Sequence, residues 1–233
     1  MKINFPLLAL AVGAFAIGTT EFSPMGFLPE IANDLSVSIP QAGLLISAYA
    51  VGVMIGAPLM TLWLARFPKK TALILLMAIF TIGNVLATVA PDYMSLMGAR
   101  LITSLNHGAF FGLGSVVAAS VVPKDKQASA VAMMFMGLTI ANIGGVPLAT
   151  WLSQNTSWRM AFAAISILGI MTMLALWKAL PQDHDVVKPN VAKELRVLTR
   201  APVVLALLTT VMSAAQCLRY IPTLLRAYTY LCR

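Results

Sequence analysis

The chain has 233 residues, enough for one or two soluble domains, but its composition excludes a soluble protein. Apolar residues make up 59% of it and charged residues only 10%, whereas soluble domains carry roughly 25% charged residues. The net charge of +8 comes from bases in short gaps between long apolar runs. Because these bases form no dense patch with interleaved aromatics, the sequence argues against nucleic-acid binding and indicates a membrane protein with several spans.

Six apolar runs are long enough to cross a bilayer as helices, which takes about 20 residues. In chain order they cover residues 5–29, 42–64, 71–90, 93–121, 128–152 and 159–180. The first is not a cleaved signal peptide, because it is too long and contains Glu21. The short connections predict an all-α membrane protein, with one bundle of six helices over residues 1–180.

The distribution of basic residues predicts the orientation of this bundle. Under the positive-inside rule, loops rich in Lys and Arg face the cytoplasm. On the opposite side from the N-terminus, Arg159 is the one base next to the six spans. Eleven bases lie on the N-terminal side, which is therefore expected to be cytoplasmic: Lys2, Arg66, Lys69, Lys70, Lys124, Lys126, Lys178, Lys188, Lys193, Arg196 and Arg200.

Residues 181–200 mark the one clear domain boundary, because they are of mixed charge and contain Pro181 and Pro189. We predict a cytoplasmic loop there, between this bundle and a second one, and an incomplete seventh span at 201–217. Residues 218–233 carry three arginines and no acid on the side where the rest of the chain allows one base. We therefore expect them to be a non-native tail.

The sequence has no motif for catalysis, a cofactor or a metal. It contains neither a nucleotide-binding P-loop nor the G-x-S-x-G motif of hydrolases. Its two cysteines, Cys217 and Cys232, form no Cys/His cluster. We expect no enzyme activity, no cofactor and no metal site.

Three ionisable residues fall inside the predicted spans, where a charge costs on the order of 3 kcal/mol and is a functional candidate by default. At a rise of about 1.5 Å per residue, Glu21 and Arg100 lie at a similar depth, and His107 lies roughly 10 Å deeper. We predict that Glu21 and Arg100 meet if the first and fourth spans face a common space. The alternatives are that Arg100 snorkels to the interface, that Glu21 ends its helix early and that His107 is a hydrogen-bonded core residue.

Polar residues of the fourth span follow helical spacing, so Arg100, Thr103, Ser104 and His107 share one face. That face predicts a wet cavity, with Thr103 and Ser104 as substrate contacts. Asn142 in the fifth span is a third candidate contact. The alternative for all three is hydrogen bonding between helices without any substrate.

The fifth span contains Pro147 shortly after Gly144 and Gly145. Proline and glycine at this spacing predict a bend in the helix. Bent, glycine-rich helices are where transporters flex, although static bundles contain them too.

Several segments together resemble the major facilitator superfamily and, more narrowly, the arabinose-efflux branch of its drug:proton antiporters. They are TTEFSPMGFLPEIA (19–32), NHGAFFG (106–112), GLTIANIGGVPLATWL (137–152) and WRMAF (158–162). The resemblance implies two six-helix bundles built of inverted three-helix repeats, with the substrate near the midplane between them.

The resemblance also implies roles for individual residues. Glu21 stands in the helix where related antiporters carry a protonatable acid, and Arg100 matches their proton-coupling arginine, beside His107. The loop after the second span lacks the family's Asp, because Ala65 replaces it. The positions expected to act in gating or flexing are Arg66, Lys69, Lys70, Gly137, Gly145 and Pro147.

The sequence therefore predicts a secondary transporter of the bacterial inner membrane that couples protons to the efflux of small organic solutes, drug-like or sugar-like. Its expected partners are a small-molecule substrate, protons and the lipid bilayer, with no nucleic acid. Such transporters have about twelve spans, so we expect activity to need a missing C-terminal half or another chain. The alternatives are an inactive fragment, a six-helix subunit that needs a partner chain, and a uniporter-type facilitator.

Overall fold

The computed structural model describes residues 4–180 and residue 205. The chain divides into two units, Met1–Val187 and Lys188–Arg233, and the fold given below is that of the first. The predicted loop at 181–200, the seventh span at 201–217 and the tail at 218–233 lie outside the described residues, apart from Leu205. They stay predictions.

Six helical segments of the described part are long and apolar enough to cross a membrane, which confirms the predicted all-α bundle. The first three spans are α1 (Phe5–Gly26), α3 (Ile39–Leu64) and α4 (Lys69–Thr88), and a short helix, α2 (Leu28–Asp34), joins α1 to α3. The fourth span consists of α5 (Tyr93–Ser104) and α6 (His107–Ser120). The fifth runs through η1 (Lys124–Lys126), α7 (Gln127–Ile140), η2 (Ala141–Gly145) and α8 (Val146–Asn155), and the sixth is α9 (Trp158–Ala179).

Capping boxes fix the start of two of these helices. Before α3, the Gln41 N–H donates to Ser38 Oγ over 3.3 Å, and the Ser38 N–H donates to Gln41 Oε1 over 3.0 Å. Before α5, Asp92 and Ser95 make the same reciprocal pair, at 2.9 and 3.2 Å. Both capping boxes satisfy N–H groups that the first turn of a helix leaves without a partner.

Two helices break where periodicity alone predicts continuity. α1 ends at Gly26 rather than near residue 29, because Phe27 leaves the helical region (φ −128°, ψ 25°). Pro29 then occupies the first turn of α2, where its missing N–H costs nothing. The fourth span turns at Leu105 and Asn106, and the Asn106 side chain is fully buried there. Neither its Nδ2 nor its Oδ1 has a hydrogen-bond partner within the described part of the chain.

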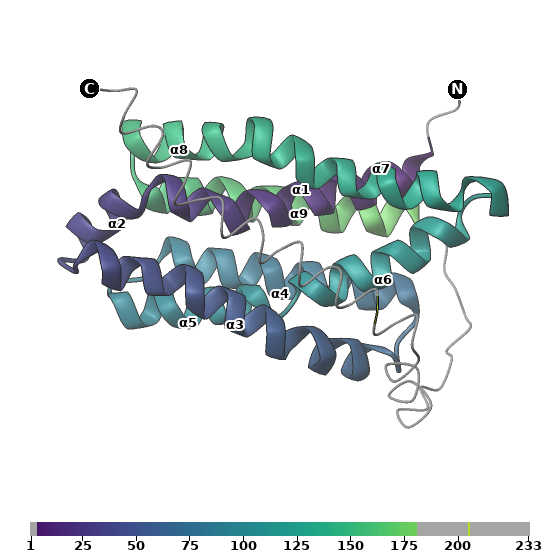
Figure 1. Cartoon of the computed structure of the whole chain (residues 1–233), viewed down its shortest axis with the longest axis horizontal. Helices are drawn as coiled ribbons and strands as arrows, with labels where there is room; N and C mark the ends of the chain where they lie inside the picture. The colour runs from purple at the N-terminus through teal and green to yellow at the C-terminus, as the bar shows by residue number, and fades with distance from the viewer. Residues whose placement is uncertain (1–3, 181–204, 206–233) are drawn as a thin grey trace. The chain divides into compact units, whose positions relative to one another are not determined.

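The bundle is organised around α1 and α4. α1 contacts α7, η2, α8 and α9, whereas α4 contacts α5 and α9. α3 packs on α5 and α6. Figure 1 shows α1 running alongside α7 and α9, with α3, α4 and α5 on the other side of the bundle. The packing of α4 on α9 therefore joins the two groups of helices.

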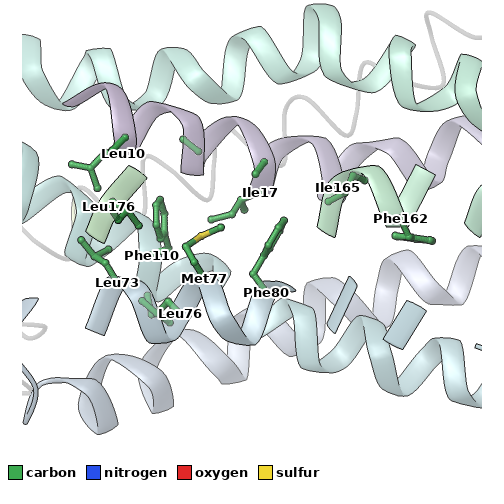
Figure 2. Close-up of a cluster of buried hydrophobic side chains, with 14 of the residues drawn as sticks. Leu10, Ile17, Leu73, Leu76, Met77, Phe80, Phe110, Phe162, Ile165 and Leu176 are labelled. Atoms are coloured by element: carbon green, nitrogen blue, oxygen red, sulfur yellow. The ribbon is translucent and has the colours of Figure 1, made fainter. Parts of the chain in front are cut away.

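The core lies between these groups, as Figure 2 shows. Its side chains are aliphatic, aromatic or methionine, and they come mostly from α1, α4 and α9. The members labelled in Figure 2 are Leu10, Ile17, Leu73, Leu76, Met77, Phe80, Phe110, Phe162, Ile165 and Leu176, all of them buried.

Burial differs sharply between the spans. In the most apolar stretch of α1, 56% of the residues are buried inside the bundle, against 22% in α3 and 22% in the fifth span. α3 and the fifth span therefore leave most of their apolar surface for lipid or for another helical unit to cover.

Candidate functional site

Arg100 on α5 is the largest polar side chain in the interior and is only 1% exposed. Its Nη1 donates to the Thr20 carbonyl oxygen on α1 over 2.9 Å. Its guanidinium carbon lies 4.2 Å from the centre of the Tyr49 ring and 5.9 Å from that of Phe162. Nε and Nη2 have no hydrogen-bond partner among the described residues. Arg100 is thus a buried cation held mainly by one carbonyl and aromatic faces.

Tyr49 on α3 links this cation to the other two ionisable residues. Its hydroxyl lies 3.2 Å from His107 Nδ1, and His107 Nε2 lies 3.8 Å from Glu21 Oε2. If the Tyr49 hydroxyl donates to Nδ1, the proton of a neutral imidazole sits on Nε2 and faces the carboxylate. Glu21, His107, Tyr49 and Arg100, here called the interior network, therefore connect four helical segments: α1, α6, α3 and α5.

The structure brings the three predicted ionisable residues together, but not as a direct pair of Glu21 and Arg100. Among the described residues, these two form no ion pair within 4.0 Å, and Tyr49 and His107 lie between them in the chain of contacts. Sequence reasoning did not single out Tyr49. The available signal was a tyrosine in the middle of a span, because tyrosines of membrane proteins concentrate at the interfaces.

Thr103 and Ser104 lie between helices. The Thr103 hydroxyl donates to the Ala99 carbonyl over 2.8 Å, and the Ser104 hydroxyl donates to the Leu101 carbonyl over 2.6 Å. Thr103 packs on Gly83 of α4, and Ser104 packs on Gly52 of α3. Both residues are buried, at 1% and 0% exposure, so their role as substrate contacts stays a prediction.

Gly137 and Gly145 allow the fifth span to approach α1 closely. A Cβ at Gly137 would meet the Ala11 carbonyl oxygen, and one at Gly145 would meet the Thr19 hydroxyl. Gly144 has open space instead. The two glycines therefore serve packing between α1 and the fifth span, and their part in flexing stays a prediction.

The helix around Asn142 is irregular. Residues Ala141–Gly145 form a π-helical turn, and Pro147 lies in the first turn of α8, just after it. Asn142 is exposed, and its Nδ2 donates to the Leu138 carbonyl over 3.0 Å. π turns inside α-helices are frequent at functional sites, and Asn142 is thus placed at the surface of an unusual turn.

The predicted gating bases lie around the loop between α3 and α4. Arg66 Nε donates to the Trp63 carbonyl over 2.8 Å, and Lys69 begins α4. Lys70 Nζ donates to the Leu180 carbonyl over 2.7 Å, which ties the start of α4 to the residue that caps the C-terminal end of α9. None of these three residues lies within the interior network.

A second polar cluster lies at the opposite end of the bundle from these bases. Both Arg159 Nη1 and Trp158 Nε1 donate to Asp34 Oδ2, the latter over 3.1 Å. Arg159 Nη2 donates to the Ala90 carbonyl over 3.0 Å, and its guanidinium carbon lies 4.2 Å from the centre of the Trp158 ring. Asp34, Trp158, Arg159 and Ala90, here called the Asp34 cluster, join α2 and α9 to the residues just after α4.

The hydrogen bond from Arg159 holds the pKa of Asp34 below its ordinary value of 3.8. Slight burial opposes this shift, and the hydrogen bond from Trp158 adds to it. Over the part of the chain that the structure describes, no three His, Cys, Asp or Glu side chains gather into a set able to hold a metal.

Comparison with known proteins identifies the family to which this arrangement belongs. Residues 10–231 match the profile of the Major Facilitator Superfamily. The chain belongs to this superfamily. The resemblance seen in the sequence is thereby confirmed, and the family is one of membrane transporters rather than enzymes.

Similar proteins agree with this assignment. The inner membrane transport protein YdhP of Escherichia coli (strain K12) is 68% identical over 214 residues, which are 92% of this chain and 55% of YdhP. A chloramphenicol resistance protein of Streptomyces lividans is 32% identical over 192 residues, 82% of this chain and 49% of that protein. The crystal structure of the peptide transporter POT matches 93% of this chain and 46% of its own, with a TM-score of 0.68 and 13% identity.

The chain spans about half the length of the curated relatives it matches. The likeness to POT, at 13% identity, concerns the fold alone and covers about half of that transporter. The six described spans thus correspond to half of a superfamily transporter. Together with YdhP, they indicate a multi-pass protein of the bacterial inner membrane.

Proposed function

We propose that this chain forms the part of a proton-coupled efflux transporter that carries the proton site, with Glu21 as the group that takes up and releases the proton. The substrates are small organic solutes, drug-like or sugar-like. The observation that carries the proposal is the interior network, which links an accessible carboxylate to a fully buried arginine through a tyrosine and a histidine.

Accessibility distinguishes the two ends of this network. The Glu21 side chain is 27% exposed and that of His107 is 15% exposed, whereas Arg100 is 1% exposed. A proton can therefore reach Glu21 from the surface of the unit, while Arg100 provides a fixed positive charge in the interior. Protonation removes the charge that attracts His107 and Arg100, and so changes the interactions that join α1 to α3, α5 and α6.

The same proposal assigns roles around the network. Thr103, Ser104 and Asn142 contribute polar contacts to the solute. The bases of the loop between α3 and α4 and the glycine–proline segment of the fifth span act in gating, at Arg66, Lys69, Lys70, Gly137, Gly145 and Pro147. Lys70 supports this role by its contact with the Leu180 carbonyl, at the start of the predicted loop between bundles.

A partner is part of the proposal, because α3 and the fifth span are each only 22% buried in their most apolar stretch. A second helical bundle would cover this surface. The relatives support this, because they are about twice as long as the matched part of this chain. A six-helix subunit that pairs with another chain remains the second candidate, since the same exposed surface favours any helical partner.

A chimera tests the proposal. Residues 1–200 of this chain are joined to the remaining half of Escherichia coli YdhP and reconstituted in proteoliposomes. Efflux is measured for chloramphenicol as a drug-like probe and for L-arabinose as a sugar-like probe, with a pH-sensitive dye in the lumen. We expect solute movement to carry protons the other way, and Glu21→Gln to abolish the proton flux.

Glu30→Gln is the matched control, because Glu30 lies on α2, outside the spans, and should leave coupling intact. Solute movement without proton flux in the unchanged chimera would favour a uniporter. Proton-coupled efflux by residues 1–233 alone would favour a six-helix subunit that assembles with its own copies. Coupling that survives Glu21→Gln would overturn the assignment of Glu21.

A further inference from the structure

A groove lies between α1 and α9, at the end of the bundle where α1 begins and α9 ends. Its volume is about 640 Å³, within the range of about 300–1,000 Å³ that is usual for ligand pockets. The lining residues of each helix follow helical spacing and so share one face. They include Phe5, Leu8 and Val12 on α1, and Ala175, Lys178 and Ala179 on α9. We call this cavity the α1–α9 groove.

The lining of the groove is apolar apart from one residue. Ala175 and Ala179 leave space on the α9 side, because neither side chain extends beyond Cβ. On the α1 side, Phe5 is 67% exposed and Leu8 is 50% exposed, so much of their apolar surface is uncovered by the described part of the chain. Apolar surface of this kind favours a hydrocarbon occupant over a polar solute.

The groove faces away from the interior network. Val12 and Glu21 are nine positions apart on α1, which places them about 14 Å apart along the helix axis and on roughly opposite faces. The seven positions from Phe5 to Val12 cover about 10 Å of the axis, whereas the hydrocarbon of one leaflet is roughly 15 Å thick. The groove therefore extends over the depth at which lipid acyl chains lie.

Of the described residues that line the groove, only Lys178 is charged. It lies in the last turn of α9 and is exposed. No Asp or Glu of residues 4–180 forms an ion pair with it. At the same end of the bundle, the described residues include one acid, Asp125, and five further bases: Arg66, Lys69, Lys70, Lys124 and Lys126. This end therefore attracts anions, and it is the end that the positive-inside rule predicts to be cytoplasmic.

We propose that the α1–α9 groove binds an anionic phospholipid of the cytoplasmic leaflet, with one acyl chain in the groove and the phosphate at Lys178. Basic pockets between membrane helices on the cytoplasmic side bind anionic headgroups, and the apolar lining supplies the contact for the chain. A zwitterionic lipid offers the same chains, but its own cation competes with Lys178 for the phosphate. This inference goes beyond the proposed function, because the groove lies outside the interior network.

Photolabelling in nanodiscs tests the site. The 233-residue chain is reconstituted in dioleoylphosphatidylcholine with a minor share of a phosphatidylglycerol that carries a diazirine in its acyl chain, and cross-links are mapped by peptide mass spectrometry. We expect labelling at residues 5–12 of α1 and 175–179 of α9. Added dioleoylphosphatidylglycerol should suppress it, and the same amount of dioleoylphosphatidylcholine should not. An excess of inorganic phosphate should not suppress it either, because phosphate brings no acyl chain.

Substitutions at Lys178 separate a specific contact from the general attraction of a basic surface. Lys178→Gln should lower the labelling of the groove about fivefold relative to the total labelling of the chain, the effect of one basic residue near an anionic surface. Lys178→Arg should retain it, because the positive charge is kept. Lys126→Gln is the matched control, since it removes an exposed base at the same end that does not line the groove, and it should change nothing.

Filling the groove tests the acyl chain independently of the charge. Ala179→Leu places a larger apolar side chain in the groove and keeps Lys178. We expect it to lower labelling of the groove by the phosphatidylglycerol probe and by a phosphatidylcholine probe with the same diazirine chain. A side chain on the outer surface of a lipid-facing helix would leave both unchanged.

The lipid site is overturned if the native chain gives no cross-links in the groove, if Lys178→Gln leaves them unchanged, or if both lipids compete equally. Suppression by inorganic phosphate would show a simple anion site instead and would also overturn it. The chimera with the YdhP half must give the same labelling, because its loss there would mean that the second bundle covers the groove. Proton flux is measured separately, so the proposed function and the lipid site fail by different results.

Discussion

The interior network and the Asp34 cluster use the same components in different ways. Each contains an arginine whose guanidinium carbon lies 4.2 Å from the centre of an aromatic ring, and each contains one acid. In the Asp34 cluster the arginine and the ring both bond the carboxylate directly, and a second arginine nitrogen bonds a carbonyl. In the interior network two side chains separate the acid from the arginine.

This difference distinguishes a cluster that stabilises the fold from one whose interactions can change during transport. The Asp34 cluster is partly exposed and well paired, so it stabilises one arrangement of α2 and α9. The interior network buries a cation, two of whose nitrogens have no hydrogen-bond partner among residues 4–180, a costly condition in a low-dielectric interior. Proteins retain such local violations mainly at functional sites, and this favours the interior network as the place where charge moves.

The largest effect is expected from Arg100→Met in the chimera with the YdhP half. Proton-coupled efflux should fall by roughly tenfold or more, because the fixed interior charge is lost. The temperature of unfolding should stay the same or rise, since replacing a poorly paired buried charge by an apolar side chain of similar size is often neutral or stabilising. Efflux in proteoliposomes and thermal unfolding in detergent measure the two effects.

Arg159→Met is the matched change in the Asp34 cluster, and the opposite outcome is expected there, with lower stability and retained efflux. If Arg100→Met unfolds the protein while the surviving fraction still transports at the normal rate, Arg100 is a structural residue and the comparison fails.

A smaller effect should follow from Tyr49→Phe, which keeps the ring beneath Arg100 and removes the hydroxyl that reaches His107. One hydrogen bond contributes about 1 kcal/mol, so we expect coupled efflux to fall about fivefold and the unfolding temperature to fall by about 2–4 °C. Tyr93→Phe is the control. Its hydroxyl also makes one hydrogen bond, to the Gln41 carbonyl over 2.7 Å, but far from the network. Equal losses in both variants would show that the effect is not specific to the network.

The smallest effect is expected from Asp34→Asn, which weakens an ion pair whose side chains are 31% and 46% exposed. At pH 7 the free energy of unfolding should fall by about 0.5–1 kcal/mol. Because folding lowers the pKa of Asp34, the carboxylate contributes its full stability above the pKa of the unfolded chain and loses it as pH falls through the folded pKa.

The difference in unfolding temperature between the native protein and Asp34→Asn should therefore be greatest at neutral pH and should begin to shrink as pH falls below about 4. Thermal unfolding at a series of pH values measures this. A difference that does not shrink at all between pH 7 and the lowest pH at which the protein stays folded would mean that Asn disturbs the packing of Trp158 rather than the charge of the pair.

The sequence predicted the six spans well, because an apolar run of about 20 residues has few alternatives in a membrane. It also placed Glu21, Arg100 and His107 as the ionisable residues of the interior. The ends of the helices were harder to predict from the sequence. Gly26 and Pro29 flank the break at Phe27 and are local breakers, whereas no strong breaker marks the turn at Leu105 and Asn106, so this second interruption depends on tertiary packing.

The turn at Leu105 and Asn106 also explains why the predicted single polar face does not continue along the whole fourth span. Thr103 and Ser104 precede it and lie against the glycines of α4 and α3, whereas His107 follows it and reaches Tyr49 and Glu21. The contribution of Tyr49 could not be read from its own span, because it arises from residues that are 51 and 58 positions further along the chain, Arg100 and His107.

The π turn at Ala141–Gly145 has a consequence for the geometry of the fifth span. A π turn holds an extra residue compared with an α turn, and each residue of an α-helix rotates the chain by about 100°. The side chains of α8 are therefore rotated relative to the direction that an uninterrupted α7 would give them. α7 contacts α1 and α6, while α8 contacts α1 and α9, so this one additional residue lets a single span follow α1 while it changes its second neighbour from α6 to α9.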